Sequence, residues 1–401
     1  MKKTLFALFL LIAVAATAQK PRPDAFDPLP DTSLSPKAVD MATTLEEMEA
    51  WNRYPTYEVY VAMMQRFADN YPDLCHLDTI GTSIQGRLIL SLAITGSALT
   101  DNYRPEFFYS STMHGDEVTG FYLMLRLCDT LLRSYGTSQD ITNLLDRTRI
   151  CINPLSNPDG TYHGGNSTVA RAWRYNSDYV DLNRNYPDPF GTDPLEPLQP
   201  ENEAMIDYVS QHNFRLAANL HGGSEVMNYP WDSFTSGQQL NEHSEWWKEV
   251  CKRFVDTCRR VDSQRFRDVN SRGYINGGDW YVIHNGRQDY FNYYHNIREL
   301  TMELSTSKTL STTRLNHYWQ CQSHALINYI KEIHNLDDTS AVGICPQPQP
   351  QAENICVYPN PTTGSITVQG TYGSYHYDLS DRPSGVYILN VEGRPVKVVK
   401  R

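Results

Sequence analysis

Short apolar runs alternate with amphipathic stretches through most of the chain. Five runs are rich in β-branched or aromatic residues and predict β-strands, at 87–95, 106–112, 148–153, 215–220 and 299–304. Two stretches, 117–132 and 239–258, place apolar residues at helical spacing and predict helices. This alternation predicts an α/β fold in which helices cover both faces of a central sheet. It continues from about residue 45 to residue 336, which we assign to one large domain.

The first 18 residues follow a different pattern. Lys2 and Lys3 precede an apolar run at 5–16, and Ala16-Thr17-Ala18 resembles a cleavage site, so residues 1–18 predict a secretory signal peptide. A membrane anchor is the alternative, but about 12 apolar residues are too few to cross a hydrocarbon core of roughly 30 Å as a helix. No later run reaches ~18 apolar residues, so we expect no stable membrane span and expect export across the inner membrane.

Proline-rich segments divide the rest of the chain. Residues 19–44 are Pro-rich and aperiodic and are expected to form an N-terminal lead-in. Residues 337–355 contain alternating proline and glutamine, which is typical of a linker. The last segment, 356–401, returns to short apolar strands punctuated by turn residues and predicts a small β-sandwich-like tail.

The composition and net charge of the chain indicate which kinds of partner are expected. A chain of 401 residues with 40% hydrophobic content can bury a full core. The formal net charge of −11 argues against a nucleic-acid partner, because phosphate binding needs clustered Lys and Arg, and it favours a cationic substrate. The eight cysteines belong to a chain expected to be exported, where disulfides are permitted, but their pairing stays open.

Two predicted strands end in groups that can bind a metal. His114 and Glu117 lie three residues apart between the strand at 106–112 and the helix at 117–132, and His221 directly follows the strand at 215–220. Two histidines and one glutamate leave a coordination position open for water, which is the arrangement of catalytic zinc. On its own, the His-x-x-Glu spacing does not distinguish a metal site from a hydrogen-bonded histidine.

Several further segments occur in one order over roughly 200 residues, and together they resemble the zinc metallocarboxypeptidase family, most closely its carboxypeptidase N/E/D branch. The segments are Met113-His114-Gly115-Asp116-Glu117, Asn157-Pro158-Asp159-Gly160, Trp173-Arg174, Asp181-Leu182-Asn183-Arg184-Asn185-Tyr186-Pro187, Leu220-His221-Gly222-Gly223, Asn228-Tyr229-Pro230, Trp280-Tyr281, Gln288-Asp289-Tyr290 and Thr301-Met302-Glu303-Leu304. The resemblance implies an α/β domain with a mixed central β-sheet and one Zn²⁺ per chain.

The resemblance also implies roles for the matching residues. His114, Glu117 and His221 would bind zinc, Glu303 would be the general base, and Arg174 would stabilise the oxyanion of the tetrahedral intermediate. The substrate's terminal carboxylate would be bound by Asn183 and Arg184, and Tyr281 would close over it. Without the motif, the alternatives are a solvated surface residue for each arginine and a packed aromatic for Tyr281. The alternative for Glu303 is an exposed edge-strand carboxylate, but on a predicted inner strand a buried glutamate needs a role of this kind.

The predicted substrates are peptide or protein C-termini that end in Lys or Arg. Asp232 occupies the position where the N/E/D branch keeps an aspartate in the side-chain pocket, and Gln288 also matches that branch. A buried carboxylate left unpaired by an apolar side chain costs several kcal/mol, enough for discrimination of order 10³. A turn-capping role for Asp232 is the alternative. On the same fold, a carboxypeptidase that trims cell-wall peptides or a non-catalytic peptide-binding module also remains open.

The tail at 356–401 has its own resemblance. Pro359-Asn360-Pro361, Gly385-Val386-Tyr387 and the strand-like end at 396–401 resemble the C-terminal sorting domain of bacterial type IX secretion. This implies the type IX machinery as a partner and a secreted or cell-surface location reached across the outer membrane. An ordinary β accessory domain is the alternative.

Overall fold

The computed structural model describes residues 39–96, 104–190, 194, 196–336, 356–358, 362–369, 374–391 and 394–401. The predicted signal peptide at 1–18, most of the Pro-rich segment at 19–44 and the linker at 337–355 lie outside these residues. No helix in the described part is long and apolar enough to cross a membrane.

An eight-stranded mixed sheet runs through the large domain, in the order β3-β4-β6-β5-β7-β10-β8-β9. The strands are β3 (Cys75–Thr82), β4 (Leu88–Ile94), β5 (Glu106–Ser111), β6 (Arg149–Asn153), β7 (Phe214–His221), β8 (Glu225–Tyr229), β9 (Tyr274–Asn276) and β10 (Arg298–Leu304). The inner strands β6, β5, β7 and β10 are parallel, whereas β3 and β4 on one side and the β8–β10 pair on the other are antiparallel. The predicted α/β fold with a mixed central sheet is confirmed, and all five predicted strands are present.

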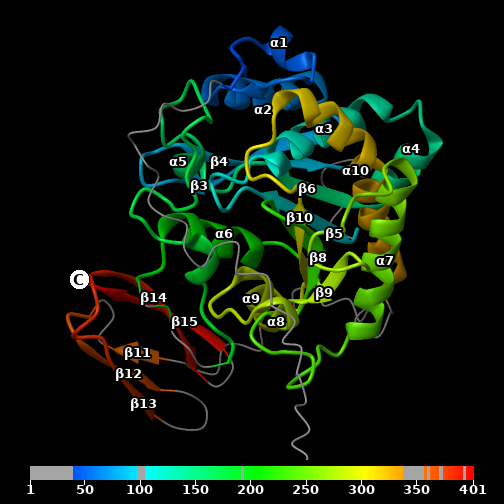
Figure 1. Ribbon diagram of the computed structural model, residues 1–401. Coiled ribbons are helices and arrows are strands. Elements are labelled where there is room, and N and C mark those ends of the chain that lie inside the picture. The colour runs from blue at the N-terminus through cyan, green and yellow to red at the C-terminus, as the bar shows by residue number, and fades with distance from the viewer. Residues whose placement is uncertain are drawn as a thin grey trace, which may run out of the picture.

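Helices cover both faces of this sheet (Figure 1). One apolar cluster joins the sheet to α2 (Tyr57–Asn70), α3 (Thr119–Ser134), α7 (Ser244–Val261) and α10 (Leu315–Lys331). A second cluster joins the other face to α6 (Pro200–Ser210) and α9 (Arg287–Tyr294). Because side chains alternate across a strand, Phe107 and Tyr109 enter the first cluster and Phe108 the second. Both predicted helices are present, as α3 and α7.

Shorter elements complete the domain. They are β1 (Met41–Ala42), α1 (Leu45–Glu49), β2 (Tyr54–Pro55), α4 (Gln139–Arg147), α5 (Pro158–Thr161) and α8 (Gly277–Trp280). β1 pairs with β2, and Ala42 is buried, so residues 41–42 of the Pro-rich segment belong to the folded body. A two-residue strand has no periodicity that the sequence could reveal.

The register of the inner strands positions the candidate site. Within the parallel pair β7–β10, Glu303 lies opposite His221, and within β5–β7, Ser111 lies opposite Leu220. The carboxyl ends of β5, β7 and β10 therefore lie at one edge of the sheet, where parallel α/β sheets commonly bind ligands. The loop carrying His114 and Glu117 starts at that edge, directly after β5.

Two small antiparallel sheets form the C-terminal tail beside the large domain (Figure 1). The first contains β11 (Cys356–Tyr358), β12 (Ser365–Gln369) and β13 (Ser374–Asp378), and the second contains β14 (Gly385–Val391) and β15 (Arg394–Lys400). Ile366, Val368, Leu389 and Val398 belong to one small core shared by the two sheets. The tail contacts the large domain through an antiparallel bridge between Leu198 and Val386.

Six cysteines of the large domain form no disulfide. Cys75, Cys128, Cys151, Cys251, Cys258 and Cys321 are free and buried. Burial in apolar surroundings raises the pKa of Cys151 and Cys75 to about 12, so these thiols stay protonated and act as small core residues. Export would permit disulfides without requiring them, and Cys75, Cys128, Cys151, Cys251 and Cys258 pack in the hydrophobic core instead.

Candidate active site

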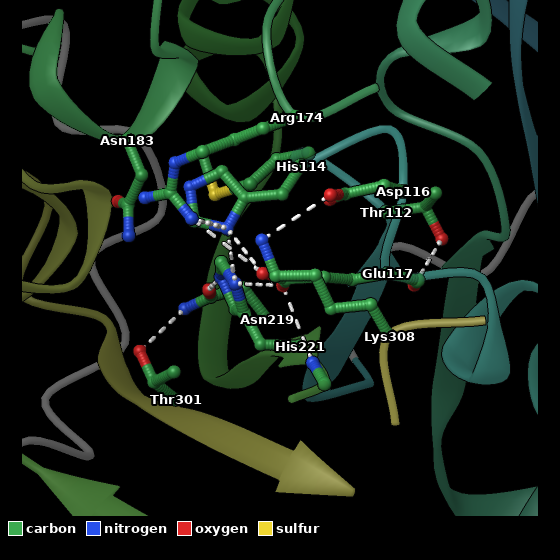
Figure 2. A network of polar contacts seen from close by, with 12 residues as sticks. Thr112, His114, Asp116, Glu117, Arg174, Asn183, Asn219, His221, Thr301 and Lys308 are labelled. Carbon is green, nitrogen blue, oxygen red and sulfur yellow. Dashed lines mark hydrogen bonds and ion pairs between the residues drawn. The ribbon is translucent and has the colours of Figure 1, made fainter. Parts of the chain in front are cut away.

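Three donor side chains converge at the edge of the sheet. His221 Nδ1 lies 3.0 Å from His114 Nδ1 and 2.8 Å from Glu117 Oε2, and His114 Nδ1 lies 3.1 Å from Glu117 Oε1. Figure 2 shows the three side chains pointing toward one another from two different strand ends. All three are buried. Two imidazole nitrogens and a carboxylate that face one point fit a zinc ion with one position left for water.

Polar neighbours hold both imidazole rings. His114 Nε2 lies 3.1 Å from Asp181 Oδ1, and His221 Nε2 lies 2.5 Å from Asn219 Oδ1. Each ring therefore hydrogen-bonds through Nε2 and directs Nδ1 toward the centre of the cluster. Such partners fix the tautomer and orientation of metal-binding histidines.

Burial and charge tune the cluster. Burial lowers the pKa of His221 to about 4, so its ring is neutral and its lone pair is available. Burial alone would raise the pKa of Glu117, but the contacts with His114 and His221 hold it well below the usual value. Glu117 is therefore a carboxylate, the form that binds a metal.

Glu303 lies on a central strand beside this cluster. Because β10 is hydrogen-bonded to β7 on one side and β8 on the other, Glu303 is not on an edge strand, and it is only 8% exposed. Its register opposite His221 brings its carboxylate into the same cavity. The exposed edge-strand alternative for Glu303 is thus wrong.

Arg174 is buried and reaches the cluster. Its Nη2 donates to Asp181 Oδ2 at 2.8 Å. Its Nη1 lies 3.2 Å from His114 Nδ1 and 3.6 Å from Glu117 Oε1 (Figure 2). Asp181 therefore contacts both a candidate metal ligand and this guanidinium. The solvated-surface alternative for Arg174 does not hold.

The Asn157-Pro158-Asp159-Gly160 segment braces the two loops that carry His114 and Arg174. Asn157 Nδ2 donates to the carbonyls of Met113 and Arg174, at 3.1 and 3.3 Å. A Cβ on Gly160 would lie 2.5 Å from the Tyr175 carbonyl oxygen, so no other residue fits at this close approach. The motif thus holds the site in place without entering the cavity.

The remaining predicted residues line the same cavity, with one exception. Asn183, Arg184, Tyr281 and Asp232 lie on its wall together with the metal-binding candidates, Arg174 and Glu303. Asn183 Oδ1 accepts from the Arg287 backbone N–H at 3.0 Å, which leaves its amide nitrogen as the donor. Gln288 does not line the cavity and instead lies behind Asp232.

Asp232 is held by a buried polar network. Gln288 Nε2 donates to Asp232 Oδ1 at 2.9 Å, and Asp289 accepts from the backbone N–H groups of Asp232 and Ser233, both at 2.9 Å. Asp232 is 3% exposed. Burial raises its pKa well above the usual value, and the nearby Asp289 raises it further. Its carboxylate lines the cavity, so turn capping does not account for its position.

Sequence reasoning missed three residues that shape the site. Asp181 and Asn219 orient the histidines, and Gly277 makes room for the Asp232 carboxylate, because a Cβ there would lie 1.8 Å from Asp232 Oδ1. The role of Asn219 could have been inferred from the sequence. It is a polar residue two positions before His221 in an apolar strand, so both side chains lie on the same face of the strand. The role of Gly277 could not have been inferred in this way, because it depends on a contact between loops that are distant in the sequence.

The fold and the site define a class of metallopeptidase, and the family comparison agrees. Residues 60–325 match the model of the zinc carboxypeptidase family, described as Peptidase_M14. The match covers more than half of the chain, and the protein belongs to this family.

Curated relatives lie in the predicted N/E/D-like branch. Carboxypeptidase D of Mus musculus is 33% identical over 311 residues, which cover 73% of this chain and 22% of the relative. Carboxypeptidase M of Mus musculus is 33% identical over 301 residues (70% of this chain, 66% of the relative). The carboxypeptidase N catalytic chain of Rattus norvegicus is 31% identical over 317 residues (70% and 69%). The chain thus spans about a fifth of the length of the carboxypeptidase D relatives that it matches.

Solved structures share the fold. The carboxypeptidase A of Helicoverpa armigera gives a TM-score of 0.61 at 19% identity, covering 72% of this chain and 75% of that chain. Thrombin activatable fibrinolysis inhibitor gives a TM-score of 0.63 at 17% identity, covering 73% and 78%. One catalytic zinc ion is the family's cofactor, and His114, Glu117 and His221 form the cluster that fits it.

Proposed function

We propose that this protein is an active zinc carboxypeptidase that releases single Lys or Arg residues from peptide C-termini. The observation that carries this proposal is one cavity lined by a three-donor cluster, Glu303 and the buried Asp232. A zinc ion, when bound, polarises the scissile carbonyl and lowers the pKa of water. The non-catalytic alternative would require a lost ligand or base, and none is missing.

Glu303 is the proposed proton carrier. It takes a proton from the attacking water and passes it to the nitrogen of the departing amino acid. Its place on β10 opposite His221 keeps it within the cavity and on a rigid strand. Arg174, oriented by Asp181, donates to the oxygen that gains negative charge as water adds to the carbonyl.

Asn183 and Arg184 bind the terminal carboxylate, which restricts the reaction to a chain end. The planar guanidinium and the amide nitrogen supply donors to the two carboxylate oxygens. Tyr281, half-buried at the end of α8, covers the bound end of the peptide. In this proposal, the leaving residue is held by its terminal carboxylate at one end, and the scissile bond lies at its other end.

Asp232 accounts for the proposed preference for Lys and Arg. A buried carboxylate with a raised pKa is destabilised as an anion, and an entering guanidinium or ammonium would relieve that cost. The hydrogen bond from the Gln288 amide holds Asp232 Oδ1 in place, so the carboxylate keeps its position in the cavity wall whichever side chain enters. The similarity to the carboxypeptidase N/E/D branch supports the same preference.

A panel of substrates tests the function. Purified protein is assayed with peptides that end in Arg, Lys, Phe and Glu, with and without a chelator, and zinc is then restored. We expect release of Arg and Lys that the chelator stops and zinc recovers. A muropeptide ending in diaminopimelate distinguishes this proposal from the cell-wall alternative, which predicts that the muropeptide is cleaved faster than the Arg- and Lys-terminal peptides. No release from any of the four peptides or from the muropeptide would refute carboxypeptidase activity.

We further propose a secreted or cell-surface location. Residues 1–18 resemble a signal peptide and the tail at 356–401 resembles a type IX sorting domain, which would take the protein across both membranes. Deleting the tail in a host that has the type IX machinery should keep the protein in the periplasm. Normal export of the shortened chain would refute the role of the tail.

A further inference from the structure

A second group of metal-binding side chains lies away from the cavity. Among the described residues, Asp262, His317 and Cys321 each place one donor atom within 4.8 Å of the others. Asp262 follows the last residue of α7, and His317 and Cys321 lie one turn apart on one face of α10. The helices α7 and α10 pack against each other, so the group spans a contact between two elements.

The donor atoms converge on a single nitrogen. His317 Nε2 lies 3.0 Å from Asp262 Oδ2 and 3.6 Å from Cys321 Sγ. Zinc bond lengths and a tetrahedral angle would separate sulfur from nitrogen by about 3.6 Å and nitrogen from oxygen by about 3.4 Å. The three atoms are therefore nearly at the spacing that a bound ion imposes, and little side-chain movement is needed.

Charge and exposure also suit a cation. A thiolate and a carboxylate together balance a divalent ion, and the nearby cation Arg265 is already paired with Glu225 at 2.7 Å. Arg265 Nε also lies 3.2 Å from Asp262 Oδ2, so it would share that carboxylate with the ion. The side chain of His317 is 45% exposed and that of Asp262 22%, which leaves access for the ion and a water ligand.

We propose that Asp262, His317 and Cys321 bind a second divalent cation of the zinc class, with water as the fourth ligand. One nitrogen, one oxygen and one sulfur donor favour a borderline-soft ion over calcium or magnesium. Binding releases the Cys321 thiol proton to solvent, because the thiolate is the ligand. The ion clamps the C-terminal end of α7 to α10, and it takes no part in the proposed hydrolysis.

Zinc content of the full chain tests this site. After dialysis against buffered zinc, the wild type should hold about two zinc ions per chain and His317→Gln about one, with the affinity of the second site lowered at least ~10²-fold. His317 is half exposed, so this variant should fold. His324→Gln, an exposed histidine on the same helix, is the matched control and should keep both ions. Equal zinc content in wild type and His317→Gln would overturn the proposal.

Cobalt distinguishes the two sites by their ligands. The cavity cluster offers nitrogen and oxygen donors, and of the two clusters among the described residues only the second has a sulfur donor, so we assign a sulfur-to-cobalt charge-transfer band to that cluster. The wild type loaded with Co²⁺ should show this band, and Cys321→Ser should lose it while keeping peptide hydrolysis with zinc. Absence of the band in the wild type would overturn the second site. A wild-type protein that shows the band with Co²⁺ but does not hydrolyse peptides with zinc would instead count against the proposed function.

Discussion

Two buried carboxylates in one cavity have pKa values shifted in opposite directions. Glu117, at the metal end, is held well below its usual pKa because His114 and His221 outweigh the effect of burial. The pKa of Asp232, on another part of the cavity wall, is raised well above its usual value because burial and Asp289 act in the same direction. The protein thus supplies imidazole partners to Glu117, whereas under the proposed function the partner of Asp232 is the substrate.

Replacing Asp232, the proposed specificity residue, should have the largest effect on cleavage of an Arg-terminal peptide. Asp232→Asn keeps the shape and the contact with Gln288, and it removes the negative charge that an Arg side chain would pair with. We expect kcat/KM for an Arg-terminal peptide to fall about 10³-fold, with little change for a peptide that ends in citrulline. Asp279→Asn, which alters an exposed aspartate nearby, should leave both values unchanged. Unchanged Arg cleavage by Asp232→Asn would show that the pocket lies elsewhere.

Replacing the proposed general base, Glu303, should have the next largest effect. Glu303→Gln should keep its zinc but lower kcat by at least ~10², because an amide cannot take the proton from water. Zinc content by elemental analysis and kcat by single-peptide kinetics separate the two effects. Retained turnover would refute the role of Glu303, while loss of zinc would mean that this side chain supports the metal instead.

Removing the hydrogen bond that orients His221, a candidate metal ligand, should have a smaller effect than either substitution above. In Asn219→Ala, the Nε2 of His221 loses its acceptor, so the ring is free to rotate. We expect zinc affinity to fall about 10- to 100-fold, with kcat of the zinc-saturated protein nearly unchanged. Asn213→Ala, in an exposed loop before β7, is the control. A zinc affinity equal to that of the wild type would show that Asn219 does not position His221.

The smallest expected effect is a pH dependence. Because the pKa of Asp232 is raised in the free protein, its carboxylate gains a proton at a higher pH than an exposed aspartate would. The protonated form cannot pair with a cation, so KM for Arg-terminal peptides should rise as pH falls, by up to ~10-fold per pH unit below that pKa. The ratio to the KM of a citrulline peptide removes effects shared by both substrates. A ratio that does not change with pH would contradict the assigned pocket.

The sequence predicted those parts of the molecule that depend on local pattern. The strand and helix around His114 followed from an apolar run and helical spacing, and the structure confirms β5 and α3 with ends shifted by one or two residues. The short or half-exposed strands β3 and β9 were not predicted, because strand β3 lacks a clear alternation and β9 has only three residues.

The site was predictable only where family motifs marked it. His221 and Glu303 are 82 positions apart in the sequence and meet only through the register of β7 and β10. Gly277 and Asp232 are brought into contact by loops with no repeating pattern. Such contacts depend on tertiary packing, which neither periodicity nor composition encodes.

One measurement tests the central claim most directly. Two peptides that differ only in a C-terminal Arg or its uncharged isostere citrulline are compared by kcat/KM with the zinc-loaded protein. The account predicts that the Arg peptide is cleaved at least ~10²-fold more efficiently, because only the cation pairs with Asp232. Equal efficiency for the two peptides would contradict it.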